Sequence, residues 1–208
     1  MPGQVIFRND LGSPLYVTLF YECPLPNRFS SLAMMAYKAE ANMTVEFQLQ
    51  QNPYAFTWAK YNQKHKGIFT TDNQVECYPR SNNVITFSND KGPGFKDQTG
   101  APVDELDIKI DKNVRSNSYY GGLCLGNKPI YAQLMQPGDT QRYPTQMNLV
   151  FGYSLQPIET GQIIAPTAIK QVSLREYQSF GQVFIELDRN GNINISTQVS
   201  AGVEADKA

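Results

Sequence analysis

The chain has 208 residues, 18 Lys and Arg against 19 Asp and Glu, a net charge of −1 and a single histidine, His65. Such a charge balance excludes the basic surface that nucleic acid or an anionic membrane demands. One histidine supplies little of the residue that acid–base chemistry near neutral pH uses most. The 16 Asn and 17 Gln nearly equal the charged groups in number, and a surface rich in amides is suited to hydrogen-bonded contact.

The sequence predicts no membrane-spanning helix, because no stretch approaches the roughly 18 consecutive apolar residues that such a helix needs. Its first residues lack the basic start, apolar region and cleavage site of a signal peptide, so we expect a cytoplasmic protein, or one exported without a cleaved signal peptide. Cys23, Cys77 and Cys124 are widely spaced and form no CxxC pair. They favour free thiols in a reducing compartment over a disulfide.

Segments of alternating, β-branched and aromatic residues recur along the whole chain, separated by Gly, Pro, Asn and Asp. Many short strands at close spacing are typical of a sandwich or barrel. We therefore predict an all-β fold, a single antiparallel β-sandwich with long loops over residues 1–199, followed by a polar C-terminal tail, 200–208. The predicted strands cover residues 4–8, 15–22, 32–38, 44–49, 54–60, 74–78, 84–88, 106–110, 119–125, 130–135, 148–154, 168–174, 183–188 and 193–199.

Between these strands, the composition predicts long loops at 89–103 and 136–147, where Gly, Pro and polar residues gather. Residues 161–175 could hold one short helical turn. Asn190-Gly191 between the last two strands predicts a hairpin with a type I′ turn. The nearby Asp and Asn residues also resemble the front of a calcium loop, but the glycine is misplaced and the terminal glutamate is missing, so the hairpin is favoured.

His65 lies between two lysines, which favours a solvated side chain. The alternatives are a base for Cys23 or Cys77, which needs an orienting third group, and a zinc site shared with the cysteines, which lacks the paired ligand spacing. We expect no metal and no cofactor.

Four carboxylates, Asp104, Glu105, Asp107 and Asp111, form an acidic cluster. Glu105 and Asp107 would share one face of a strand with Lys109, which is typical of a half-exposed strand; a metal or catalytic site is the alternative. The segment Gly121–Gly126 is rich in glycine but no helix follows it. It therefore predicts a bulge or a close approach of strands, not a phosphate cradle.

Aromatic residues are abundant, and most are expected in the core. An aromatic ring combined with a polar group also suits contact with a sugar or a protein. On this basis the candidate ligand-binding residues are Trp58, Tyr119 and Tyr120, and the candidate interface residue is Tyr143.

Several short fragments along the chain are informative when they are taken together in their order and spacing. The fragments are Ser31-Leu32-Ala33-Met34, Thr44-Val45-Glu46-Phe47, Phe56-Thr57-Trp58, Asn83-Val84-Ile85-Thr86-Phe87, Gly122, Gly126, Tyr131-Ala132-Gln133, Gln136-Pro137 and Phe151-Gly152-Tyr153. Together they resemble the RhiA-like family, bacterial proteins named for a member expressed in the rhizosphere, over about residues 5–195. A looser resemblance links the chain to bacterial inclusion-body proteins. These resemblances imply a soluble β protein made in quantity, without known enzymatic activity and without catalytic residues to assign.

Taken together, these features predict a non-enzymatic, self-associating bacterial protein that forms a homo-oligomer, an ordered assembly or an intracellular inclusion. The alternative is a β-sandwich module that binds a carbohydrate or a surface. A hydrolase that uses the acidic strand or a Cys–His65 pair is a third, weaker hypothesis.

Overall fold

The structure is a computed structural model that describes residues 3–23, 30–49, 53–61, 72–145, 147–165, 167–177 and 179–198. Within these ranges every regular element is a strand, apart from one 3-10 turn, η2 (Arg175–Tyr177). The predicted all-β class is therefore confirmed. None of the described residues forms a helix long and apolar enough to cross a membrane.

The strands of the described ranges form four sheets, and each sheet is given below with neighbouring strands in order. Sheet 1 contains β17 (Ile193–Gln198), β16 (Gln182–Leu187), β1 (Gln4–Asn9) and β5 (Thr44–Gln48). Sheet 2 contains β15 (Lys170–Ser173), β14 (Asn148–Ser154), β2 (Leu15–Glu22) and β4 (Met35–Ala39). Sheet 3 contains β3 (Ser30–Ser31), β12 (Lys128–Leu134), β11 (Tyr119–Leu125), β6 (Tyr54–Lys60) and β7 (Asp72–Cys77). Sheet 4 contains β13 (Thr140–Tyr143), β10 (Leu106–Ile110), β8 (Val84–Ser88) and β9 (Gly94–Thr99).

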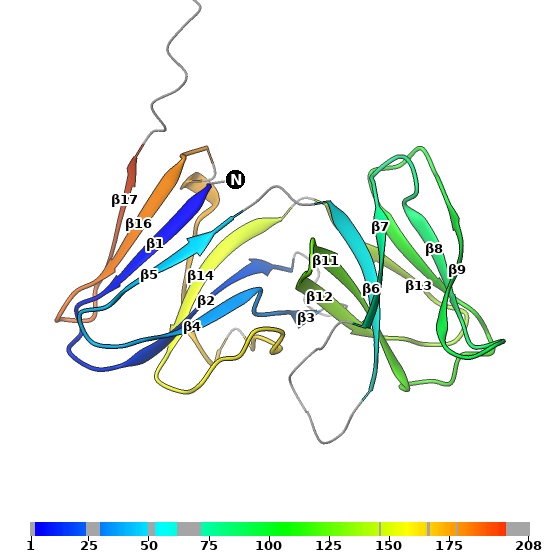
Figure 1. The fold of residues 1–208 in the computed structure, drawn as a ribbon, viewed down its shortest axis with the longest axis horizontal. Helices are drawn as coiled ribbons and strands as arrows, with labels where there is room; N and C mark the ends of the chain where they lie inside the picture. Colours follow the sequence, from blue (N-terminus) through cyan, green and yellow to red (C-terminus); the bar gives the residue numbers. More distant parts are fainter. Residues whose placement is uncertain are drawn as a thin grey trace, which may run out of the picture.

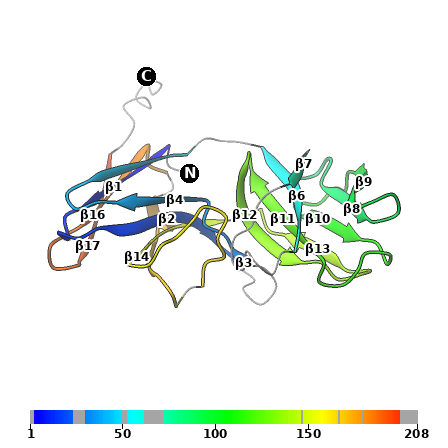
Figure 2. The same ribbon diagram turned by 60° about the horizontal axis from the view of Figure 1, so that its bottom comes forward.

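The four sheets pack as two sandwiches that lie side by side (Figures 1 and 2). In the first, the ring of Phe7 on β1 stacks on that of Phe151 on β14, with 5.0 Å between centroids. In the second, Trp58 on β6 packs against Phe87 on β8 at 5.3 Å. We call sheets 1 and 2 the terminal sandwich, because both ends of the described chain contribute to it, and sheets 3 and 4 the central sandwich.

Strand alternation builds the core. On β1, Val5 and Phe7 are fully buried, whereas Ile6 and Arg8 point outward, as the two-residue period of a strand requires. One apolar cluster includes residues from all four sheets. The predicted single sandwich is thus a pair of sandwiches with a shared core, and its predicted antiparallel pairing holds except between β1 and β16 and between β8 and β10, which are parallel.

The two sandwiches share one pairing scheme. A parallel pair, β1 with β16 or β10 with β8, lies at the centre of one sheet, flanked on both sides by antiparallel neighbours. The opposite sheet is antiparallel throughout, in the order β15-β14-β2-β4 or β7-β6-β11-β12. Strands β10, β11, β12 and β13 therefore correspond to β1, β2, β4 and β5, and β6 to β9 correspond to β14 to β17.

The correspondence extends to register. The amide of Asp10 donates to the carbonyl of Leu187 at 2.9 Å at the end of β1, and the amide of Asp111 donates to the carbonyl of Phe87 at 3.0 Å at the end of β10. Equivalent strands are also about one hundred residues apart: β6 begins at Tyr54 and β14 at Asn148, 94 residues later.

The described residues consequently form two similar halves in tandem, each with the same series of eight strands, β1, β2 and β4 to β9 in the first and β10 to β17 in the second. Neither half forms a sandwich alone. Each sandwich takes four of these strands from the start of one half and four from the end of the other half.

Four predicted elements differ from the structure: one strand, two loops and one helical turn. The predicted strand 32–38 is interrupted, so that β3 ends at Ser31 and β4 begins at Met35. The predicted long loops contain β9 and β13; both strands carry charged residues and give weak apolar alternation. The helical turn η2 begins only at the end of the predicted 161–175 segment.

The hairpin between β16 and β17 is confirmed, but its predicted turn type is wrong. A type I′ turn needs positive φ at both central residues, and in this hairpin only Gly191 has it, at 81°. The amide of Gly191 donates to the carbonyl of Asp188 at 3.0 Å, which is a type I turn followed by a glycine bulge. The Asp188 carboxylate accepts from the amides of Asn190 and Asn192, each at 2.8 Å, so the acidic group of the calcium-loop alternative stabilises the turn instead.

Candidate interaction surface

The outer face of sheet 1 carries a row of glutamines across all four strands. The register places Gln198 beside Gln182, Gln182 beside Gln4, and Gln4 beside Gln48. Gln182 donates to the side-chain oxygen of Gln4 at 2.7 Å, and Gln4 donates to Glu46 at 2.9 Å. Hydrogen bonds thus connect Gln182, Gln4 and Glu46, and the amide-rich composition of the chain is visible on this face.

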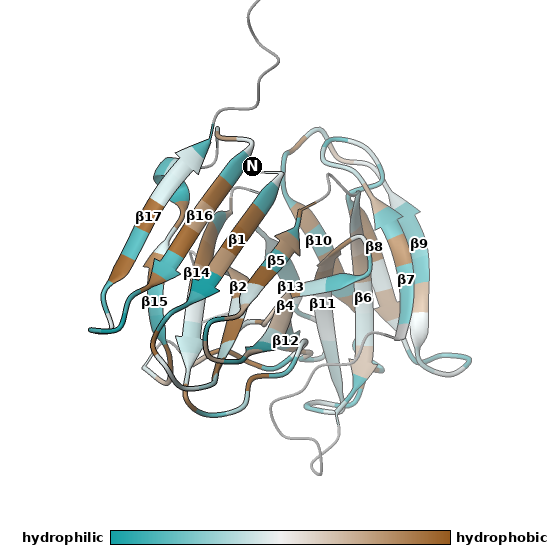
Figure 3. Cartoon of the chain, turned by 60° about the vertical axis from the view of Figure 1, so that its left-hand side comes forward, coloured by the Kyte–Doolittle hydropathy of each residue, from teal (hydrophilic) through white to brown (hydrophobic). Residues whose placement is uncertain are grey.

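Next to this row lies an open hollow of about 640 Å³, lined by residues of β1, β5, β16 and β17. Its apolar lining includes the half-buried pair Ile6 and Phe184, which lie opposite each other on the outer face of β1 and β16. Arg8 and Glu186 line it at the next outward position and are exposed. Figure 3 faces this sheet, with β17 at its free edge.

β17 is an edge strand whose sequence, INISTQ, has no charged residue. Asn194, Ser196 and Gln198 are exposed, whereas Ile193 and Ile195 are half-buried against the main core. A strand edge presents unpaired N–H and C=O groups, and proteins usually prevent pairing there with charges, proline or very short strands. β17 has none of these protections.

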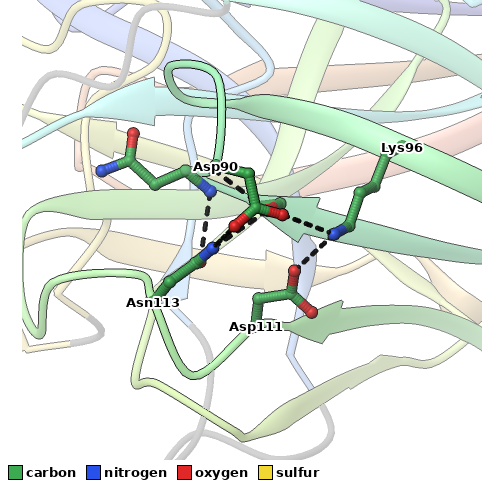
Figure 4. Close-up of polar contacts among 6 residues, drawn as sticks. Asp90, Lys96, Asp111 and Asn113 are labelled. Carbon is green, nitrogen blue, oxygen red and sulfur yellow. Dashed lines mark hydrogen bonds and ion pairs between the residues drawn. The ribbon is translucent and has the colours of Figure 1, made fainter.

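The equivalent region of the central sandwich is charged. Lys96 on β9 lies 2.7 Å from Asp111 and 3.0 Å from Asp90, and Asn113 also donates to Asp90 (Figure 4). The hydrogen bonds from Lys96 lower the pKa of both carboxyl groups, and those carboxylates raise the pKa of Lys96. Among the described residues no group of His, Cys, Asp and Glu is arranged to hold a metal ion, and a lysine supplies the positive charge between these two carboxylates.

The structure corrects most of the predicted aromatic contact residues. Trp58 is 8% exposed and Tyr119 9%, and their rings contact each other in the core of the central sandwich. Tyr143, the predicted interface residue, is fully buried, and its hydroxyl donates to Gln141 at 2.8 Å. These three side chains point inward, so Tyr143 offers no outer surface and Trp58 and Tyr119 offer very little. Tyr120 is half-buried beside Tyr61, and its role as a ligand-binding residue stays a prediction.

The cysteines are free and buried, as the prediction of plain thiols requires. Burial raises the pKa of Cys77 and of Cys124 to about 12, so both are protonated at neutral pH. A protonated thiol is a poor nucleophile. His65, considered as a base for such a thiol, lies outside the described residues.

The acidic cluster is divided among separate cations. Asp104 forms a two-contact pair with Arg80, at 2.7 and 3.0 Å, and Asp111 pairs with Lys96. Glu105 and Asp107 both lie near Arg142, at 3.9 and 3.8 Å. This arrangement supports the interpretation of a partly solvated strand.

The glycine-rich strand β11 supports the predicted close approach. A Cβ on Gly121 would collide with the side-chain oxygen of Gln141 and lie 3.2 Å from the methyl group of Met135. The register of β11 also shifts between Leu123 and Cys124, which is the predicted bulge.

Two paired sandwiches with an uncharged edge and an amide-lined face define an all-β protein with surfaces suited to contact. The family model of RhiA matches residues 3–198, nearly the entire chain, and the chain therefore belongs to the RhiA family. The resemblance inferred from the sequence fragments is confirmed. No curated protein and no solved structure matches the chain.

Proposed function

We propose that this member of the RhiA family is a non-enzymatic, self-associating protein that forms a homo-oligomer or an ordered intracellular assembly. The observation that carries the proposal is the outer face of sheet 1. Its half-buried pair, Ile6 and Phe184, is bordered by the row of glutamines and by exposed polar side chains. An apolar centre with a polar, hydrogen-bonding rim is the usual anatomy of a protein interface.

The charge of the chain supports the same proposal. With a net charge of −1, two copies repel each other little, and near-zero net charge favours association. The free, buried thiols support a reducing compartment and hence a location in the bacterial cytoplasm, with export without a cleaved signal peptide as the alternative.

The hollow itself favours a second candidate function, the binding of a carbohydrate. A sugar ring packs on an aromatic face while its hydroxyls bond to polar groups, and the hollow offers Phe184 together with Arg8, Glu186 and Asn194. These residues replace the buried Trp58 and Tyr119 as the aromatic and polar contacts of that hypothesis.

Light scattering after size-exclusion chromatography, from micromolar to millimolar protein, tests the main proposal. We expect the mass to exceed that of one chain and to rise with concentration. Phe184→Ala removes apolar contact area and should lower the mass, whereas the matched control Leu155→Ala, at a side chain that is 68% exposed and outside the hollow, should not.

A strictly monomeric wild type at every concentration contradicts self-association. A glycan array tests the second candidate function, carbohydrate binding. If the protein is monomeric, and if a glycan binds the wild type and Leu155→Ala but not Phe184→Ala, the hollow is a sugar-binding site.

A further inference from the structure

We propose that β17 pairs antiparallel with β17 of a second copy, so that two copies of sheet 1 join into one continuous sheet. This inference rests on the proposed function and adds a second contact to the outer face of sheet 1, namely the free edge of the same sheet. It is carried by the edge strands, by a comparison of β17 with β9, and by the direction of the backbone groups on β17.

The first argument is that β17 differs from the other edge strands of the described residues. Each of those edges carries a charged residue, except β3, which is only two residues long. A charge or a very short strand prevents edge-to-edge pairing. The charged residues are Lys38 on β4, Glu46 on β5, Glu76 on β7, Lys96 on β9, Arg142 on β13 and Lys170 on β15.

The second argument is internal to the chain. β17 corresponds to β9, and within the two hairpins Asn194 lies opposite Glu186 as Lys96 lies opposite Thr86. Glu186 and Thr86 are themselves equivalent, each beside the parallel strand of its sheet. The same architectural position thus holds a lysine in the central sandwich and a neutral amide in the terminal sandwich.

The third argument is the direction of the free backbone groups. The amide of Asp188 donates to the carbonyl of Asn192 at 3.0 Å. Hydrogen-bonded and non-hydrogen-bonded pairs alternate along an antiparallel ladder, so the backbone groups of Asn194 face β16. Those of Ile193, Ile195 and Thr197 then point away from the sheet and are available to another strand.

A second copy fits this edge because a two-fold axis pairs β17 with the same uncharged strand running in the opposite direction. A charged residue near the axis would lie close to its own counterpart, and like charges destabilise a sheet, but β17 carries none. If the two-fold axis passes beside Ile195, the backbone groups of Ile195 pair with those of Ile195 of the partner subunit. The backbone groups of Ile193 then pair with those of Thr197 of the partner subunit. The half-buried isoleucines of the two copies are covered at the same time, and β-branched pairs stabilise such a ladder.

The test introduces a lysine, and with it a positive charge, into β17 at the position that is equivalent to Lys96 on β9. Asn194→Lys places that charge on an exposed position without touching the core, and Gln156→Lys makes the same change of charge at an exposed position in the loop after β14. Light scattering and sedimentation equilibrium should show that Asn194→Lys raises the dissociation constant by about tenfold or more, while Gln156→Lys leaves it unchanged. Ser196→Glu, also exposed, is the second variant, and circular dichroism and thermal melts verify that each variant folds.

If the wild type associates and both β17 variants associate as tightly as Gln156→Lys, the edge proposal is overturned and self-association stands on another surface. If the wild type is monomeric at every concentration, both proposals are overturned. If β17 variants lose binding to a different protein while the wild type alone stays monomeric, the occupant of the edge is not a second copy, and the proposal is again overturned.

Discussion

The terminal and central sandwiches share the same strand pairings, apart from the additional short strand β3 beside β12, but differ at their free edges. In the central sandwich, Lys96 on β9 is held between Asp90 and Asp111, and in the terminal sandwich, β17 presents Asn194 at the same position. The fold therefore decides where an edge lies, and the side chains decide whether that edge can accept another strand. The molecule thus contains two equivalent edge strands, one charged and therefore protected from pairing, and one uncharged and unprotected.

The cores differ as well. Val17 and Val45 fill positions of the terminal sandwich that Gly121 and Gln141 fill in the central one, as the registers of β1, β2, β10 and β11 show. Gln141 is 1% exposed and donates to the carbonyls of Gln133 and Leu134, each at 3.2 Å. A buried polar side chain is tolerated when it is hydrogen-bonded. The same arrangement of strands therefore accommodates two valines in one core and a glycine with a glutamine in the other.

The largest expected effect concerns the equivalent phenylalanines Phe151 and Phe56, both fully buried. Replacing either with alanine should lower the free energy of unfolding by about 3–5 kcal/mol. Because one apolar cluster joins the sandwiches, we expect each variant to shift one common unfolding transition in calorimetry and in urea. Two separate transitions, with each variant moving only one of them, would show that the sandwiches unfold independently.

A smaller effect is expected when the core residues of the central sandwich are replaced by their counterparts from the terminal sandwich. Gly121→Val forces a side chain against Gln141 and Met135 and should destabilise the protein by about 1–3 kcal/mol. The double variant Gly121→Val/Gln141→Val recreates the Val17–Val45 combination and should recover part of that loss. A double variant whose loss equals or exceeds the sum of the single variants would contradict the structural equivalence; urea unfolding measures all three.

The smallest effect is a pH dependence at the charged edge. The folded-state pKa values of Asp90 and Asp111 are lowered from 3.8 by Lys96, so their contribution to stability is present above the unfolded-state pKa and is lost as the pH falls through the folded-state values. Lys96→Met should therefore flatten the decline of stability in acid only slightly, because water screens ion pairs between exposed groups. An acid unfolding profile identical to that of the wild type would contradict this assignment.

Much of the strand content could be predicted from residue patterns. The alternation of apolar residues in β2 and the turn residues before β17 were sufficient to predict these elements, because both signals are local in the sequence. β9 and β13 could not be predicted in the same way, since their charged residues interrupt the apolar period. The exchange of strands between the two halves depends on long-range pairing, and equivalent strands such as LYVTLFYE and YYGGLCL share little sequence.

The contact surface was harder to predict, because face and edge are set by the register of the sheets. A signal for the aromatic residues did exist: Trp58 is two residues from Phe56 and so shares its inward face. Tyr143 likewise shares the face of Gln141. The neutral sequence of β17 was visible, but its position at an edge became clear only from the sheet order.

Amide-resolved hydrogen exchange on β17, as a function of protein concentration, tests the central claim most directly. The account predicts that the outward-facing amides of Ile193, Ile195 and Thr197 exchange rapidly when dilute and become protected as the concentration rises, while the amide of Phe95 on β9 does not change. Rapid exchange of the three β17 amides at every concentration at which the protein is oligomeric would contradict it.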